Sequence, residues 1–203
     1  SVARNAAARN ASGEVLFFLD ADDWWERGKI DSHMSVWSGR TPSFVIDRST
    51  PMTPDGARSY WIGGLDRDGP AEWSEFLSHH AWASGSSFSV RRSTYEAIGG
   101  FNERLDKFQD VDFWVRCAQA AGPAYTLRAS YTNYAVSDAP SVSKSPAMVE
   151  ENLTRLFDGW PFASDEQKSA FASHAYLTVA EVTPWPKSVE MFRAFQLEWR
   201  YSK

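Results

Sequence analysis

The chain has 203 residues, a formal net charge of −5, 23% charged residues and 15% aromatic residues. This composition predicts a folded domain and excludes a disordered chain. A chain of this length buries about 70% of its unfolded surface, so it needs no disulfide or metal to hold its fold. The acidic balance argues against a nucleic-acid-binding protein, which needs a basic face.

Cysteine usage and hydropathy predict the compartment. Cys117 is the only cysteine, so no intrachain disulfide can form, and a reducing environment is favoured. We expect its thiol to be a small buried hydrophobe. No apolar run reaches the roughly 18 residues that a membrane span needs, and the first residues lack a signal-peptide pattern. The predictions are a cytoplasmic protein, with peripheral contact at the inner face of the membrane as an option.

The first part of the chain alternates helical and strand patterns. Residues 1–12 are rich in helix formers, and Val15–Leu19 is a continuous apolar run of the kind found in a central parallel strand. A helix is predicted over 24–37 and a strand over 43–47. Residues 48–71 read as loop with a strand near 59–62, followed by a short helix at 72–80.

The second part continues the pattern and then becomes helical. The predicted elements are a strand over 86–90, a helix over 93–98 with a capping box from Ser93 to Glu96, a helix over 111–121, strands over 124–127 and 131–136, and helices over 147–158, 165–180 and 187–201. The fold class is therefore α/β, a mixed sheet flanked by helices. We predict an α/β domain over 1–140 and a C-terminal helical extension over 141–203, whose aromatic side chains pack onto the domain.

Three carboxylates follow the first predicted strand: Asp20, Asp22 and Asp23. Open α/β sheets bind ligands outside the carboxyl ends of their strands, and Mg²⁺ is held by one or two carboxylates together with substrate phosphates. The alternative is that Asp23 caps the next helix while the others are solvated. The D-x-D pattern alone is weakly specific.

A second acidic group opens the helix predicted from residue 111. Asp110 suits either a helix cap or a general base at a loop–helix junction, and spacing alone favours the cap. Asp112 and Arg116 are spaced to pair on one helix face. Upstream, Glu103 follows two glycines and could orient a substrate hydroxyl or be a plain loop carboxylate.

Taken in order, these segments resemble a family 2 glycosyltransferase of the GT-A fold, a Rossmann-related α/β fold. The resemblance covers roughly residues 1–136 and rests on the order and spacing of Ala3-Arg4-Asn5, Ala11-Ser12-Gly13-Glu14, Phe18-Leu19-Asp20-Ala21-Asp22-Asp23-Trp24, Ser86-Ser87-Phe88-Ser89-Val90-Arg91-Arg92, Ile98-Gly99-Gly100-Phe101-Asn102-Glu103 and Gln109-Asp110-Val111-Asp112-Phe113-Trp114-Val115-Arg116.

The resemblance implies an inverting transfer of sugar from a nucleotide-diphosphate donor to an acceptor hydroxyl. Asp22 would bind the divalent metal, Mg²⁺ or Mn²⁺, that holds the diphosphate, and Asp20 would contact the metal or the ribose. Arg4 would lie near the nucleotide, and Asp110 would be the catalytic base. Residues on the acceptor side, or supporting the base, would be Ser87, Glu103, Asp112, Trp114 and Arg116, with 82–87 along the acceptor groove.

The chain departs from the family pattern in two places. Gln109 stands where the family usually has Glu, which removes a charge beside the base. The family's first strand–helix units are also absent, so we expect an exposed sheet edge, poor stability and little activity for these 203 residues alone.

Three functions remain open. The leading one is a glycosyltransferase that builds a cell-surface polysaccharide or glycoconjugate, acting on a sugar or glycolipid acceptor. The first alternative is a catalytically inactive module of the same fold that binds a glycan or a protein. The second is a metal-dependent phosphotransferase or hydrolase, which the absence of a glycine-rich phosphate loop disfavours.

Overall fold

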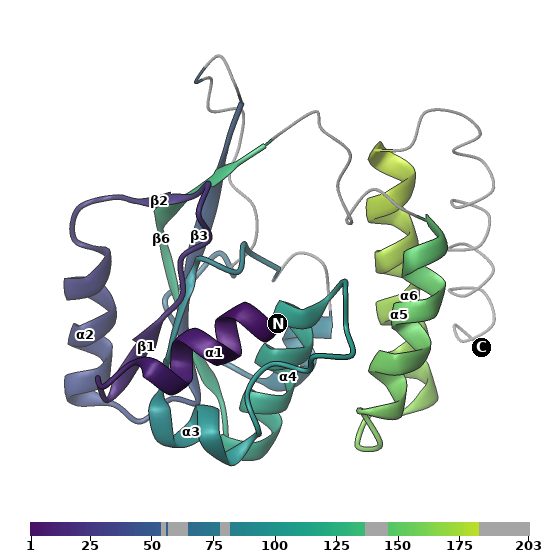
Figure 1. The fold of residues 1–203 in the computed structure, drawn as a ribbon, viewed down its shortest axis with the longest axis horizontal. Coiled ribbons are helices and arrows are strands. Elements are labelled where there is room, and N and C mark those ends of the chain that lie inside the picture. The colour runs from purple at the N-terminus through teal and green to yellow at the C-terminus, as the bar shows by residue number, and fades with distance from the viewer. Residues whose placement is uncertain (54–55, 57–64, 78–81, 137–145, 183–203) are drawn as a thin grey trace.

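A mixed sheet lies at the centre of the computed structural model, which describes residues 1–53, 56, 65–77, 82–136 and 146–182 (Figure 1). Its strand order is β1-β5-β3-β6-β2, with β4 paired to β6. The β3–β6 pair is parallel and the other pairs are antiparallel. The strands are β1 (Val15–Phe17), β2 (Trp24–Trp25), β3 (Phe44–Met52), β4 (Gly69–Ala71), β5 (Phe88–Arg91) and β6 (Ala124–Ala135).

Helices lie on both sides of this sheet. They are α1 (Val2–Asn10), α2 (Lys29–Gly39), α3 (Arg92–Ala97), α4 (Gln109–Ala121), α5 (Pro146–Asp158) and α6 (Asp165–Val182), with a 3-10 helix η1 (Trp73–Leu77). Alternate side chains of β3 explain the two layers, because successive strand residues point to opposite faces. Val45 packs with Trp37 of α2, whereas Phe44 and Ile46 join the larger core that contains Trp114 of α4.

The prediction of a central parallel strand at Val15–Leu19 is wrong in its position. β1 pairs only with β5 among the described residues, antiparallel, and lies at the end of the strand order. The apolar run has another cause, since both faces of β1 are covered. Phe18 stacks on Phe88 in the core, and Phe17 contacts the rings of Trp25 and His33 on the opposite face. An apolar run therefore indicates that both faces of a strand are covered, and it does not indicate how many of its edges are paired.

The helix predicted over 24–37 begins later. Trp24 and Trp25 form β2 and pair with Asn133 and Thr132 of β6. Helix α2 starts at Lys29, after Gly28 takes a left-handed conformation with φ of 88°. The aromatic pair favours a strand over a first helical turn. Asp23 therefore does not cap a helix.

The remaining elements differ from the prediction mainly at their ends. β6 is one strand where two were expected, and β4 lies in a segment read as loop. Neither predicted cap forms: the cap position of α3 is Arg91 and that of α4 is Phe108, and neither caps its helix with its side chain. The predicted strand near 59–62 and the helix over 187–201 lie outside the described residues.

The C-terminal helices share the main core with the sheet. Trp160 and Phe171 are fully buried, Tyr176 is buried, and Phe157 and Phe162 pack against the same cluster. This confirms, for these residues, that the aromatics after residue 146 pack onto the α/β domain. The boundary at residue 140 stays a prediction, because 137–145 lie outside the described residues.

Two smaller predictions can be compared with the structure. Cys117 is fully buried in α4, as expected, and burial raises the pKa of its thiol. Among the described residues, no helix combines the length and hydropathy needed to cross a membrane.

Candidate functional site

An ion pair between helix α1 and the segment after β1 anchors the site. Arg4 Nη2 donates to Oδ1 and Oδ2 of Asp20 at 2.7 and 2.6 Å. The guanidinium also lies over the ring of Phe101, 5.4 Å from its centroid. Gly85 makes room for it, since a Cβ at that position would lie 2.6 Å from Arg4 Nη2. Arg4 is therefore held on three sides.

The acidic segment 20–23 is a tight turn fixed at both ends. The backbone N–H of Asp20 donates to Ser86 Oγ at 2.9 Å, and that of Asp23 donates to the carbonyl of Asp20 at 3.1 Å. Asp23 Oδ1 then accepts the backbone N–H of Ala135 at 3.0 Å. The turn is thus tied to the loop before β5 and to the end of β6, while Asp22 at its tip is exposed.

The three carboxylates have different environments. Asp23 is buried, and burial raises its pKa, with the neighbouring charges of Asp20 and Asp22 adding to the rise. Asp20 is neutralised by Arg4. Asp22 has no hydrogen-bond or ion-pair partner within the described part of the chain. Of these three carboxylates, that of Asp22 therefore faces solvent without a partner among the described residues.

Asp110 reaches the same place from the first turn of α4. Its side chain is half-buried, and its Oδ1 accepts the N–H of Val111 at 2.9 Å. Burial raises the pKa of Asp110, the positive charge of Arg4 lowers it, and the negative charge of Asp20 raises it. Asp110 therefore lies within electrostatic range of Arg4 and Asp20. Of the four residues that the sequence selected from three separate segments, Arg4 and Asp20 are in direct contact and Asp22 lies in the same turn as Asp20.

Sequence reasoning missed two groups at this site. Tyr134 of β6 is half-buried, and burial together with the charges of Asp23, Asp110, Asp22 and Asp20 raises the pKa of its phenol. A tyrosine near the end of a strand gives no sequence signal by itself. Only the pairing of β6 with β2 and β3 reveals that this strand end meets the acidic turn.

The second missed group is Lys107. It is buried, and burial lowers the pKa of its ammonium group to about 8, against the opposing effect of Asp110. Its Nζ lies 5.1 Å from the ring centroid of Phe108. The sequence alone suggests an ordinary surface lysine, because the neighbouring residues give no sign that Lys107 is buried.

The predicted support pair Asp112–Arg116 forms. Arg116 Nη2 lies 2.6 Å from Asp112 Oδ2, and Arg116 also donates to the carbonyls of Ile98 and Gly100 at 3.0 Å. Asp112 is fully buried and accepts the indole N–H of Trp160 at 3.1 Å. The pair joins α4 to the end of α3 and to the C-terminal helices, and so fixes the helix that carries Asp110.

Glu103 lies next to α1. Asn5 Nδ2 donates to Glu103 Oε1 at 2.8 Å and to the Phe101 carbonyl at 2.9 Å, while Asn5 Oδ1 accepts the Phe101 N–H at 2.9 Å. Tyr95 donates its hydroxyl to the same Asn5 oxygen. Asn5 therefore clamps the Gly99–Glu103 loop to the helix that carries Arg4.

Two of the predicted acceptor-side residues are internal. Ser87 is fully buried, and its N–H and hydroxyl donate to the Ser84 carbonyl at 3.0 and 2.7 Å. Trp114 is fully buried in the main core. Within the predicted groove segment 82–87, only Trp82 is partly exposed. Ser87 and Trp114 can support the site through packing, whereas the exposed carboxylate of Glu103 can meet a ligand.

The carboxylates of the acidic turn suit a divalent-metal site that substrate and water would complete. Among the described residues, no three His, Cys, Asp or Glu side chains gather closely enough to hold a metal ion by themselves. Asp22 supplies one free oxygen ligand of the type that Mg²⁺ and Mn²⁺ prefer, and Mg²⁺ commonly completes its shell with substrate phosphates and water. Asp22 therefore fits the predicted metal, whereas Asp20 already has both oxygens bound by Arg4.

Sequence comparison finds a family match over the first half of the chain and one relative with a short matching segment. Residues 1–99 match the model of Glycosyl transferase family 2. TuaG of Bacillus subtilis (strain 168), which its name assigns to teichuronic acid biosynthesis as a glycosyltransferase, is 34% identical over 56 residues. That match covers 28% of this chain and 22% of TuaG.

Structure comparison extends the likeness over nearly all of the chain. TarS 1–349 of S. aureus in complex with UDP-GlcNAc superposes with a TM-score of 0.65 at 13% identity, covering 94% of this chain and 58% of TarS 1–349. The complex of TarS 1–349 with UDP gives a TM-score of 0.61, also at 13% identity, covering 98% of this chain and 67% of that one. The fold is therefore α/β and GT-A-like, and the chain spans little more than half the length of TarS 1–349 in the first comparison.

Proposed function

We propose that this chain, whose residues 1–99 match the model of Glycosyl transferase family 2, transfers a sugar from a nucleoside diphosphate to an acceptor hydroxyl with inversion at the anomeric carbon. The proposal is supported by the Arg4–Asp20 ion pair, by the exposed Asp22 in the same turn, and by Asp110 within range of the charges of Arg4 and Asp20. The cation, Arg4, suits a diphosphate, and the exposed carboxylate of Asp22 suits its metal. The carboxylate of Asp110 suits the removal of a proton.

Arg4 and Asp22 would bind the sugar donor. Arg4 places its guanidinium where it can face phosphate oxygens, and its ion pair with Asp20 and the bare backbone of Gly85 fix its position. Asp22 would hold a Mg²⁺ or Mn²⁺ ion, which when bound supplies positive charge to the leaving diphosphate.

Asp110 would act on the acceptor side. The acceptor hydroxyl loses its proton to the Asp110 carboxylate as its oxygen bonds to the anomeric carbon, and the bond from that carbon to the diphosphate oxygen breaks. The raised pKa of Asp110 makes the carboxylate a stronger base than an exposed aspartate. Gln109 beside it, in place of the usual Glu, does not take part in this proton transfer.

The acceptor class follows from the relatives. TuaG carries teichuronic acid biosynthesis in its name, and we propose a bacterial cell-wall or cell-surface polysaccharide, or its glycolipid precursor, as the acceptor. The cytoplasmic location predicted from the single cysteine stays a prediction. An inactive glycan- or protein-binding module of the same fold is the second candidate, and Gln109 is the residue that favours it.

Calorimetric titration tests the sugar-donor site. UDP and GDP are each titrated into the protein with and without Mn²⁺, and again into Asp22→Ala and into the control Asp158→Ala, which removes an exposed carboxylate from α5. We expect binding that needs the metal, is lost in Asp22→Ala and persists in the control. Failure of the unaltered protein to bind either nucleotide under any condition would overturn the proposal and leave the binding module.

A further inference from the structure

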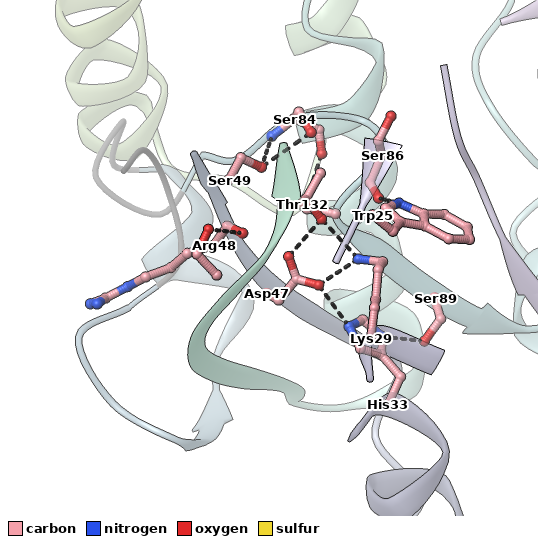
Figure 2. A network of polar contacts seen from close by, with 12 residues as sticks. Trp25, Lys29, His33, Asp47, Arg48, Ser49, Ser84, Ser86, Ser89 and Thr132 are labelled. Atoms are coloured by element: carbon pink, nitrogen blue, oxygen red, sulfur yellow. Dashed lines mark hydrogen bonds and ion pairs between the residues drawn. The ribbon is translucent and has the colours of Figure 1, made fainter. Parts of the chain in front are cut away.

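A charged network lies buried between α2 and the sheet, away from solvent. Asp47 of β3 is fully buried and accepts from three side chains: Lys29 Nζ, Thr132 Oγ1 at 2.7 Å and His33 Nε2 at 3.0 Å (Figure 2). Lys29 Nζ also donates to Thr132 Oγ1 at 2.9 Å. Lys29 is 1% exposed, and His33 and Thr132 are fully buried. These four residues are called the Asp47 network below.

The protonation of the network follows from its contacts. Burial lowers the pKa of His33 below its ordinary value, so the imidazole is neutral at pH 7. Trp37 Nε1 donates to Ser89 Oγ at 2.9 Å, which leaves the Ser89 hydroxyl to donate to His33 Nδ1 at 2.8 Å. His33 then donates from Nε2 to Asp47. Lys29 is the cationic partner of Asp47, although burial lowers its pKa as well.

Stability alone is a poor reason for such a network. Removing a lysine and an aspartate from water is costly, and well-packed apolar side chains in their place are often as stable or more so. Buried polar groups can instead fix one arrangement of neighbouring elements. Two connections link the Asp47 network to the candidate site, and they show which elements the network holds in place.

The first connection runs along β6. Thr132, inside the network, is the register partner of Trp25 in β2. Two residues later along β6 comes Tyr134, and the next backbone N–H, that of Ala135, binds Asp23. The network therefore holds β6 at the point from which it reaches the acidic turn.

The second connection runs through β2. Lys29 Nζ lies 5.3 Å from the ring centroid of Trp25, a cation–π contact. The Trp25 indole N–H donates to the Ser86 carbonyl at 2.8 Å, and Ser86 Oγ accepts the N–H of Asp20 at 2.9 Å. Figure 2 shows Trp25 and Ser86 beside the Lys29–Asp47–Thr132 group. Both ends of the acidic turn are thus attached to elements that the network fixes.

We infer that Lys29, Asp47 and Thr132 are positioning residues for the sugar-donor site. They set the position of β2 against β6, and hence that of Asp20, Asp22 and Tyr134. The effect on nucleotide binding rests on the proposed function, whereas the effect on the position of Trp25 does not. The four side chains of the network are buried, so the role that we infer for them is positioning.

A matched pair of substitutions tests this role. Thr132→Val removes the hydroxyl and keeps the shape, whereas Thr132→Ser keeps the hydroxyl. We expect Thr132→Val to weaken Mn²⁺-dependent UDP binding about tenfold and Thr132→Ser to bind like the unaltered protein. Leu156→Ala, in the fully buried part of α5, is the stability control: it should lower the melting temperature and leave the UDP affinity unchanged.

A spectroscopic reading separates this claim from the proposed function. The indole N–H resonance of Trp25, assigned through its loss in Trp25→Phe, should shift in Thr132→Val without any ligand and stay in place in Leu156→Ala. If the unaltered protein binds no nucleotide, the proposed function fails, and with it the effect on affinity. A folded Thr132→Val with an unmoved Trp25 resonance, or with unchanged UDP affinity, overturns the positioning role.

If Thr132→Val does not fold, the Trp25 resonance and the UDP affinity are measured on a second variant. Lys29→Met together with Asp47→Asn removes both buried charges at once, so neither is left unpaired. We expect the double variant to show the same shift of the Trp25 resonance and the same loss of UDP affinity. An unmoved Trp25 resonance overturns the inference.

Discussion

Arg4 is paired with Asp20, and its positive charge also acts on Asp110, a carboxylate with a different proposed task. Its ion pair with Asp20 fixes its geometry, and its charge holds the pKa of Asp110 below the value that burial alone would produce. One guanidinium thus affects two carboxylates, which we propose to act on the sugar-donor side and on the acceptor side.

Replacing Arg4 should therefore change the pH dependence of transfer. In Arg4→Met the pKa of Asp110 rises further, since the positive charge that lowered it is gone. Transfer needs the ionised carboxylate, so activity falls as pH drops through this pKa, and the fall should begin about one pH unit higher. The measurement is kcat/KM against pH, with Arg9→Met, an exposed arginine on the same helix, as control. An acid limb that stays where it was would contradict this role of Arg4.

Residue identities at the site were partly predictable from the sequence. Asp20, Asp22 and Asp110 stand at element ends, where a change from apolar to acidic residues is visible in the chain. Tyr134 and Lys107 were missed because their surroundings come from other segments. Their roles depend on burial and on distant charges, which only the packed structure supplies.

The segment before β5 shapes the site through its backbone. Gly85 lies against Arg4, where a side chain would collide with the guanidinium. The colliding atoms belong to the flexible end of Arg4, so that side chain can move aside and the fold can absorb the change.

Gly85→Ala should therefore weaken nucleotide binding and leave stability nearly unaltered. We expect Mn²⁺-dependent UDP affinity to fall about tenfold, while the melting temperature moves by no more than a few degrees. The control is Gly39→Ala at the end of α2, where a Cβ meets nothing within 4 Å. Unchanged affinity in Gly85→Ala, or an unfolded protein, would show that Gly85 does not serve to seat Arg4.

Element types were easier to predict than their partners. The helix predicted over 111–121 is present as α4, and Cys117 is buried in it as expected. The helix predicted from Trp24 was wrong because β2 exists only through its pairing with β6, more than a hundred residues away. A two-residue strand carries no periodic pattern of its own.

At the scale of the whole molecule, the order of the motifs predicted the fold better than any single element did. The expected mixed α/β sheet with a GT-A-like fold is confirmed by the strand pairing and the structural likeness to TarS. The position of β1 in the sheet was not predictable, because an apolar run reports covered faces and says nothing about paired edges. The expected poor stability and low activity of the 203 residues alone stay predictions.

The proposed reaction also depends on the whole molecule. Arg4 comes from α1, Asp22 from the turn after β1 and Asp110 from α4, and α4 is held in turn by Arg116 and, through Asp112, by Trp160 near the C-terminal helices. If these parts form one catalytic site, removing the base should stop sugar transfer without lowering the affinity for the nucleotide.

The central claim is tested most directly by Asp110→Asn, with nucleotide binding and sugar transfer measured on the same preparation. We expect UDP affinity in the presence of Mn²⁺ to stay within about twofold and the transfer rate to fall by about 10²–10⁴-fold. Asp106→Asn, an exposed carboxylate just before α4, should leave both unchanged. Transfer that continues at the original rate in Asp110→Asn would contradict the account, because Asp110 would then not be the base.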